Sequence, residues 1–230
     1  MASFDLRYIQ CAPYQVSEGE VSYGAKVKVG EAMSADITFT FAEGRLYAEG
    51  KLSEYIKELT GGTISMAVKD ILEEAQKVMY GVAEKSRTIS DAPIKGIVYT
   101  AKDSAAYVGI SFYCKDKVDG ATKFTCVLVV KALFGPPAMS KATKGQNITF
   151  STPTTTGEFL PADDAEQAVI EVATVDDEAT AIAWCDAVLT SYTPEMAALM
   201  AEEPDTTNGS DPVQYNEATE TSDTEVTGNG

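Results

Sequence analysis

The chain of 230 residues contains no histidine, and its Lys and Arg side chains stop at Lys144. Without histidine, the chain lacks the most frequent general base, the usual partner of a Ser or Cys nucleophile, and the commonest protein ligand of transition metals. No phosphate-binding glycine loop, GxSxG turn or dinucleotide fingerprint is present. The sequence therefore argues against an enzyme, and it predicts no catalytic residue, no metal and no cofactor.

Positive charge is distributed unevenly along the chain. Residues 1–144 carry all 18 basic residues and 17 of the 35 acidic ones, whereas residues 145–230 carry 18 acidic residues and no basic one. A chain with a net charge of −17 is not expected to bind nucleic acid by neutralising phosphates. Contact with DNA that avoids adhesion stays open.

Long apolar runs and paired cysteine motifs are also missing. No run reaches the roughly 18–20 apolar residues of a membrane span, and the first residues, MASFDLRYIQCAPY, lack the pattern of a signal peptide. We therefore expect a protein that is made in the cytoplasm and has no membrane partner. Cys11, Cys114, Cys126 and Cys185 show no CxxC spacing and are interpreted as small buried side chains, with Cys114 facing Cys126 across a hairpin as the alternative.

Period-two alternation predicts a mainly β (α+β) fold. In DITFTFAEG, it places Ile37, Phe39 and Phe41 on one face of a half-buried strand. Residues 107–115 and 124–134 flank the turn Asp119-Gly120 and are predicted to form one long hairpin, whose second strand is apolar on both faces and therefore central in a sheet. The pair Pro136-Pro137 should end this strand.

Helical spacing predicts one or two flanking helices. The first spans residues 70–81, with Asp70 and Glu73 as a capping pair and Gly81 as its end, and the second begins at Asp177. A short third helix is expected after Pro194. The acid pairs Asp163-Asp164 and Asp176-Asp177 are interpreted as caps or solvated groups rather than metal ligands.

The domain organisation follows from composition. Residues 1–200 are predicted to form one domain with flexible arms near residues 15–30 and 135–147, and the polar, acidic residues 201–230 are predicted to be a disordered tail.

The segment KATKGQNITFSTPTTTGEF, residues 141–159, carries the most specific pattern in the chain. Its alternation predicts a strand with Ile148 and Phe150 facing inward, and Gly145 and Gly157 bracket this strand as flexible joints. The pattern T-K-G-x-N-I-T-F-x-T-P-x-x-x-G comprises Thr143, Lys144, Gly145, Asn147, Ile148, Thr149, Phe150, Thr152, Pro153 and Gly157.

With the strands and helices that precede and follow it, this pattern resembles the major tail (tail tube) proteins of phages and prophages of Gram-positive bacteria with long, non-contractile tails. The resemblance covers roughly residues 4–190. It implies a β-sandwich or open barrel of the tail tube type, in which six copies form rings that stack into a hollow tube. The implied partners are other copies, the tape measure protein, the tail terminator and the distal tail protein, with DNA passing transiently through the lumen. With adjacent copies implied, we expect KATKGQ to be a loop or arm in which Lys144 reaches a carboxylate of a neighbouring subunit. Two explanations of the charge asymmetry then stay open, namely repulsion of DNA in the lumen, or solubility of an abundant subunit before assembly. The implied location is the virion tail, assembled in the bacterial cytoplasm.

Several alternatives stay open at this point. A tailocin-like particle or a minor tail protein would keep the same fold. An acidic β-sandwich that binds a receptor or carbohydrate after export would instead be a monomer with a signal peptide. An enzyme that uses only carboxylates is a further alternative, but the spacing of the acidic residues singles out no catalytic pair.

Overall fold

The computed structural model describes residues 2–90, 92–118, 120–139, 141, 143 and 151–190. The predicted third helix and the predicted acidic tail lie outside the described residues. The described chain is mainly β, as expected, with two helices. In chain order its elements are β1 (Ala2–Ser17), β2 (Glu20–Tyr23), β3 (Val27–Lys28), β4 (Ala32–Ala48), β5 (Lys51–Val68), α1 (Glu73–Tyr80), β6 (Ala83–Ile89), β7 (Ala92–Val98), β8 (Val108–Val118), β9 (Ala121–Phe134), β10 (Thr154–Phe159), β11 (Ile170–Val175) and α2 (Glu178–Val188).

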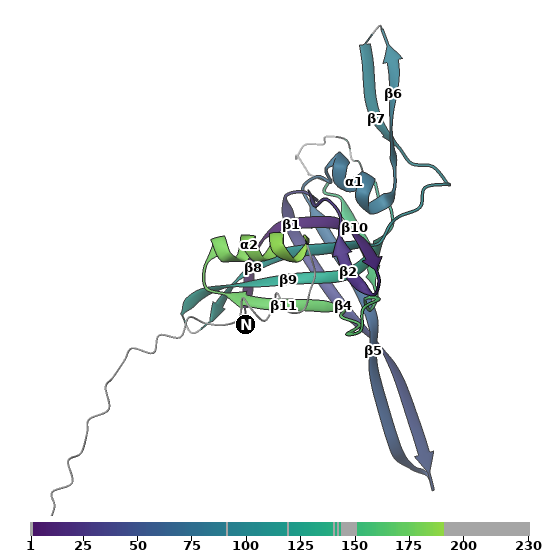
Figure 1. The fold of residues 1–230 in the computed structure, drawn as a ribbon, viewed down its shortest axis with the longest axis vertical. Helices are drawn as coiled ribbons and strands as arrows, with labels where there is room; N and C mark the ends of the chain where they lie inside the picture. The colour runs from purple at the N-terminus through teal and green to yellow at the C-terminus, as the bar shows by residue number, and fades with distance from the viewer. Residues whose placement is uncertain are drawn as a thin grey trace, which may run out of the picture.

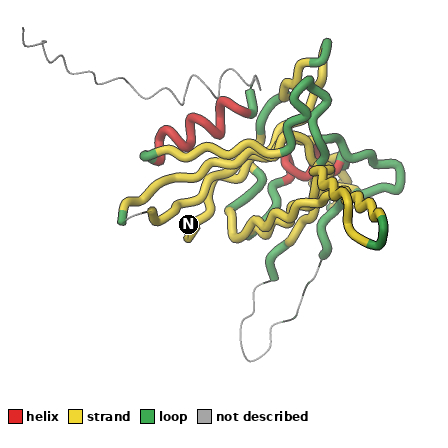
Figure 2. The backbone as a smooth tube through the Cα atoms, turned by 90° about the horizontal axis from the view of Figure 1, so that it is seen from below, coloured by secondary structure: helices red, strands yellow, loops and turns green. Residues whose placement is uncertain are grey.

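Nine of these strands form one open sheet. Its order is β2-β1-β8-β9-β10-β5-β4, with β3 paired to β1 and β11 paired to β9, while β6 and β7 form a separate two-stranded sheet. Within the described residues, the end strands β2 and β4 are not paired with each other, so the sheet does not close into a barrel. Helix α2 lies along the strands on one side of the sheet (Figure 2).

The predicted long hairpin is confirmed as β8 and β9. Strand β9 is central, as its apolar sequence indicated, because it pairs with β8 on one side and with β10 and β11 on the other. Its alternate side chains enter two separate clusters. Val129 and Phe134 lie in the cluster that α1 covers, whereas Leu128 and Val130 lie in the cluster that α2 covers.

The two helices begin differently. Helix α2 starts as predicted, because the Asp177 side chain accepts a hydrogen bond of 2.8 Å from the backbone N–H of Thr180. The predicted capping pair at the start of α1 is wrong, since its N-cap residue is Leu72 and no side chain caps it. Gly81 ends α1 as expected, in the left-handed conformation with φ of 66°.

The flexible arm predicted near residues 15–30 is instead folded onto the sheet. Strand β2 pairs with the end of β1, and β3 pairs with its middle. Val21, Tyr23 and Val29 are buried, and the Tyr23 hydroxyl donates a hydrogen bond of 2.8 Å to the carbonyl of Val130. This segment therefore belongs to the core despite its polar composition.

Two hairpins leave the body of the protein in opposite directions (Figure 1). One is the outer part of β4 and β5, in which every residue from 38 to 60 is exposed; we call it the long hairpin. The other is β6–β7. The predicted half-buried strand applies to β4 only at its base, because Ile37 is partly buried whereas Phe39 and Phe41 are 45% and 43% exposed.

The first prediction concerns Gly157, which lies inside β10 opposite Phe134 and Ile64. A Cβ atom at this position would lie 2.7 Å from Cδ1 of Phe134, a ring that is 1% exposed and has no room to move. We expect Gly157→Ala to lower the free energy of unfolding by about 1–3 kcal/mol in a denaturant titration. Gly135→Ala is the control, since its added Cβ would meet nothing within 4 Å. Equal stability of the two variants would contradict the packing described here.

Candidate functional site

The sequence pattern at residues 143–157 is only partly described by the structure. Thr143 is exposed, Thr152 and Pro153 lead into β10, and Gly157 lies within that strand. Lys144, Gly145, Asn147, Ile148, Thr149 and Phe150 lie outside the described residues. The subunit contact predicted for Lys144 therefore stays a prediction.

The end of the pattern has a structural role in the core. The buried hydroxyl of Tyr80, on α1, donates a hydrogen bond of 2.9 Å to Oγ1 of Thr155, and burial raises the pKa of Tyr80 to about 12. Phe159 is fully buried and meets the ring of Phe39 edge to face, with 5.9 Å between the ring centroids. Gly157, predicted to be a flexible joint, is instead a packed strand residue that allows Phe134 to lie against the backbone.

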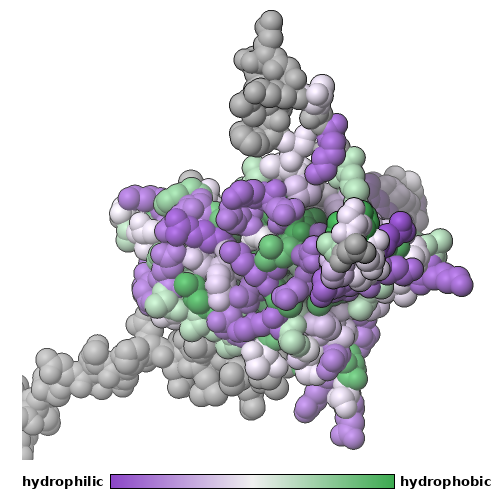
Figure 3. Space-filling view, turned by 90° about the horizontal axis from the view of Figure 1, so that it is seen from above, coloured by the Kyte–Doolittle hydropathy of each residue, from purple (hydrophilic) through white to green (hydrophobic). Residues whose placement is uncertain are grey.

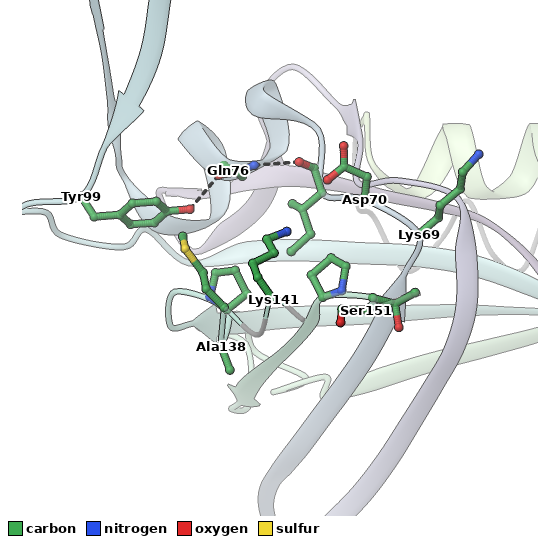
Figure 4. Close-up of a pocket in the computed structure, with 12 residues that line it drawn as sticks. Lys69, Asp70, Gln76, Tyr99, Ala138, Lys141 and Ser151 are labelled. Carbon is green, nitrogen blue, oxygen red and sulfur yellow. Dashed lines mark hydrogen bonds between the residues drawn. The ribbon is translucent and has the colours of Figure 1, made fainter. Parts of the chain in front are cut away.

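A small hollow lies beside the described part of this pattern (Figure 4). Its volume is about 180 Å³, and it lies between the start of α1 and the segments around Pro137 and Thr152. The Tyr99 hydroxyl donates to Oε1 of Gln76 at 2.7 Å, and Nε2 of Gln76 donates to the carbonyl of Ile71 at the same distance. These bonds hold Tyr99 against α1. The hollow is smaller than the roughly 300–1,000 Å³ of typical small-molecule sites.

Three of the four residues in the acid pairs Asp163-Asp164 and Asp176-Asp177 have side-chain partners, whereas Oδ1 of Asp164 is buried without a hydrogen bond in the described structure. Asp177 caps α2, and Asp176 forms an ion pair of 2.7 Å with Lys123. Asp163 forms an ion pair of 2.6 Å with Lys131. Across the described part of the chain, no group of three or more His, Cys, Asp or Glu side chains could hold a metal ion.

More generally, acids from the base-free region pair with bases from the first 144 residues. These contacts attach β11, α2 and the chain before them to the sheet. The pairs are Arg7–Glu178 at 3.1 Å, Lys115–Glu178 at 3.6 Å, Lys26–Asp186 at 2.6 Å, Lys123–Asp176 at 2.7 Å and Lys131–Asp163 at 2.6 Å. The sequence showed the charge asymmetry but not these contacts, because the paired residues are far apart along the chain.

Lys131 is the most buried of the paired bases, with 9% of the residue exposed. Its ammonium group lies 5.4 Å from the ring centroid of Tyr14 and 4.7 Å from that of Tyr107, so it also gains cation–π contacts. The hydrogen bond from Lys131 holds the pKa of Asp163 below its ordinary value. The carboxylate thus compensates a cation that is largely removed from water.

The long hairpin carries eight of the 18 exposed large hydrophobic residues of the described chain. Isolated two-stranded hairpins are marginally stable in water, and large exposed apolar patches usually mark binding surfaces. Its exposed large hydrophobic residues are Phe39, Phe41, Leu46, Tyr47, Leu52, Tyr55, Ile56 and Leu59, each between 41% and 62% exposed. Sequence reasoning recognised the start of this strand but not its length, and it missed β6–β7.

Comparison with known proteins adds no identification. The sequence matches no model of a known protein family and no curated protein. Among the described residues, no helix has the length and apolar character needed to cross a membrane. The surfaces described above are therefore the basis for any functional conclusion.

The second prediction tests the Lys131–Asp163 pair. Asp163→Asn leaves the ammonium group of Lys131 without its carboxylate. Because Asp163 is half exposed, we expect a loss of only about 1–2 kcal/mol in the free energy of unfolding at pH 7. Since pairing lowers the pKa of Asp163 in the folded state, its contribution is complete above the ordinary value of 3.8 and disappears as the pH falls through the lowered pKa.

The difference between wild type and Asp163→Asn should therefore shrink below about pH 4 in denaturant titrations across pH. Glu166→Gln is the matched control, because Glu166 is exposed, lies three residues further along the chain and has no ion pair in the described structure. A loss for Glu166→Gln as large as that for Asp163→Asn would show that the pair has no specific effect.

Proposed function

We propose that this protein is a structural virion subunit that polymerises as stacked hexameric rings and forms the tube of a long, non-contractile phage tail. The observation that carries this proposal is the long hairpin. It exposes every residue from 38 to 60, including eight large hydrophobic side chains, at a distance from the body of the molecule. Within the described part of the chain this surface stays exposed, and a second copy of a self-assembling subunit would bury it.

The placement of the hairpins supports polymerisation rather than closed dimerisation. The long hairpin and β6–β7 extend from opposite ends of the molecule (Figure 1). When the two surfaces of a contact lie at different places on each subunit, the contact is heterologous and generates rings or open stacks. A tube built of repeated rings needs contacts of this kind along its axis.

The open sheet supports ring formation. Strand β4 is an end strand, and no described strand pairs with its outer edge. Exposed strand edges pair readily with other chains. Soluble proteins therefore usually cover their edge strands or close the sheet into a barrel. In a ring, neighbouring sheets would complete one another around a central channel, as strands do in a closed barrel.

The surface and charge are compatible with a channel for DNA. Seen from the end that bears β6–β7, the molecule is mainly hydrophilic, with small hydrophobic areas (Figure 3). Six copies at a net charge of −17 give about −102 per ring. A field of this sign lets DNA pass without phosphate contacts that would hold it.

The third prediction tests self-assembly directly. Phe41 and Leu59 lie opposite each other in the hairpin, so residues 42–58 can be replaced by Asn-Gly, a favoured two-residue hairpin turn. We expect concentrated wild-type protein to form rings or tubes in negative-stain electron microscopy, and the shortened variant to stay monomeric. The shortened variant should keep the thermal midpoint of the wild-type monomer, because none of the deleted residues is buried.

A wild-type protein that stays monomeric at high concentration, even with a tail initiator complex present, would contradict the proposed function. If the shortened variant formed tubes equally well, the proposal of a tube would stand, but the long hairpin would have no role in its assembly.

A further inference from the structure

The long hairpin has two faces that differ in how their charges are paired. On one face, the carboxylate of Glu43 lies 3.3 Å from Arg45 and 3.6 Å from Lys57. The ammonium group of Lys57 also lies 4.3 Å from the ring centroid of Phe41, and the guanidinium of Arg45 lies 5.4 Å from that of Tyr55. The charges of this face are therefore compensated within the hairpin.

The opposite face carries carboxylates without such partners; we call it the acidic face. It consists of three cross-strand pairs, Ala42 with Glu58, Gly44 with Ile56, and Leu46 with Glu54. In the described part of the chain, neither Glu54 nor Glu58 forms an ion pair. The base on this face is Lys51, opposite Ala48 near the turn, and no ion pair joins it to either carboxylate. Leu46 and Ile56 are both 56% exposed. This face combines negative charge with an apolar centre.

Hairpin β6–β7 shows the same contrast with the sign reversed. On one face, Glu84 lies 2.5 Å from Lys77 of α1 and 2.9 Å from Lys95. These two bases lower the pKa of Glu84 to about 2, so the carboxylate stays ionised at neutral pH. The charges of this face are compensated by its own neighbours.

The other face of β6–β7 carries cations; we call it the basic face. Its cross-strand pairs are Lys85 with Gly96, Arg87 with Ile94, and Ile89 with Ala92. Among the described residues, Lys85 and Arg87 form no ion pair. The pKa of Asp103 is lowered mainly by two hydrogen bonds from Thr100, and the positive charge of Lys85 lowers it further. Ile89 and Ile94 are 55% and 52% exposed and line a shallow hollow of about 300 Å³.

We propose that the acidic face of the long hairpin docks on the basic face of β6–β7 in a second copy of this chain. Glu54 and Glu58 pair with Lys85 and Arg87 of that copy, and the side chain of Ile56 enters the hollow beside its Ile94. Both surfaces are exposed faces of two-stranded ribbons, and β layers pack face to face at a separation of about 10 Å. Within one chain they extend from opposite ends of the molecule, so the contact joins two copies (Figure 1).

This contact rests on the self-assembly proposed above, and it names the two surfaces that the assembly joins. Each copy uses its acidic face toward one neighbour and its basic face toward another, so the contact can repeat from copy to copy in a ring or along a stack. Because both faces are exposed and charged, the contact should weaken as salt screens the charges.

Charge reversal provides the first test. We expect Glu54→Lys with Glu58→Lys, and separately Lys85→Glu with Arg87→Glu, each to raise the concentration needed for assembly at least tenfold in a sedimentation assay. The two doubly substituted proteins mixed together should co-sediment again, because each supplies the charges that the other lost. The matched controls are Glu18→Lys with Glu20→Lys, and Lys102→Glu with Lys117→Glu, which change the net charge equally at exposed positions off both faces.

Cross-linking provides the second test, and it does not require tubes. Ile56→Cys and Ile94→Cys are made in separate proteins, mixed under oxidising conditions and examined for a covalent dimer. We expect a mixed dimer in yield well above that of either variant alone or of wild type, which reports background from the native cysteines. All variants should keep the thermal midpoint of the wild-type monomer, since the substituted side chains are exposed.

The outcomes separate this inference from the proposed function. Tubes that form with unchanged threshold after charge reversal, and without the mixed dimer, would overturn the contact while leaving the tube proposal in place. A mixed dimer and charge rescue in a protein that never forms tubes would support the contact and overturn the tube.

Discussion

The burial of strand β9 on both faces is the constraint on which the rest of the structure depends. One face packs under α1 and the other under α2, so β9 divides the core into two clusters. Along its length β9 also changes neighbours, since its first half pairs with β11 and its last residues pair with β10. Strand β10 then pairs with the base of β5, from which the long hairpin extends. The exposed hairpin is thus held at its base through β10, which pairs with both β5 and the buried end of β9.

The charge step at Lys144 has a structural component within the described fold. Acidic side chains at 163, 176, 178 and 186 pair with bases that precede Lys144, so the base-free segment docks on the sheet as a chain of opposite charge. Residues 191–230 carry nine of the acidic residues and no base, which is about half of the net charge of −17. Under the proposed function, repulsion of DNA or solubility would be assigned mainly to the charge that remains outside these pairs. The paired acids already give the asymmetry one physical role, which is to dock the base-free segment on the sheet.

Local patterns predicted those elements whose cause is local. Strands β8 and β9 were visible because their apolar alternation reflects burial, and α2 was visible because Asp177 caps it. The start of α1 was predicted wrongly, because backbone hydrogen bonds from Lys69 to Glu31 and from Leu72 to Val29 set where the helix begins. The long hairpin was missed beyond its first strand, since alternation marks a strand only where one face packs on a core. In KLSEYIKELT neither face does, so apolar and charged residues occur on both.

The same mixture of residues controls how an exposed ribbon associates. A flat apolar hairpin with open edges would pair with any copy of itself and aggregate. On the acidic face, Glu54 and Glu58 flank Ile56, so two acidic faces brought together place like charges against one another at low dielectric. A symmetric contact between two long hairpins is thereby disfavoured. Contact with the basic face of β6–β7 is instead stabilised by attraction between opposite charges. The basic face lies at the other end of the molecule, so the favoured contact joins two different surfaces and is heterologous. A heterologous contact leads to continued growth rather than to a closed dimer.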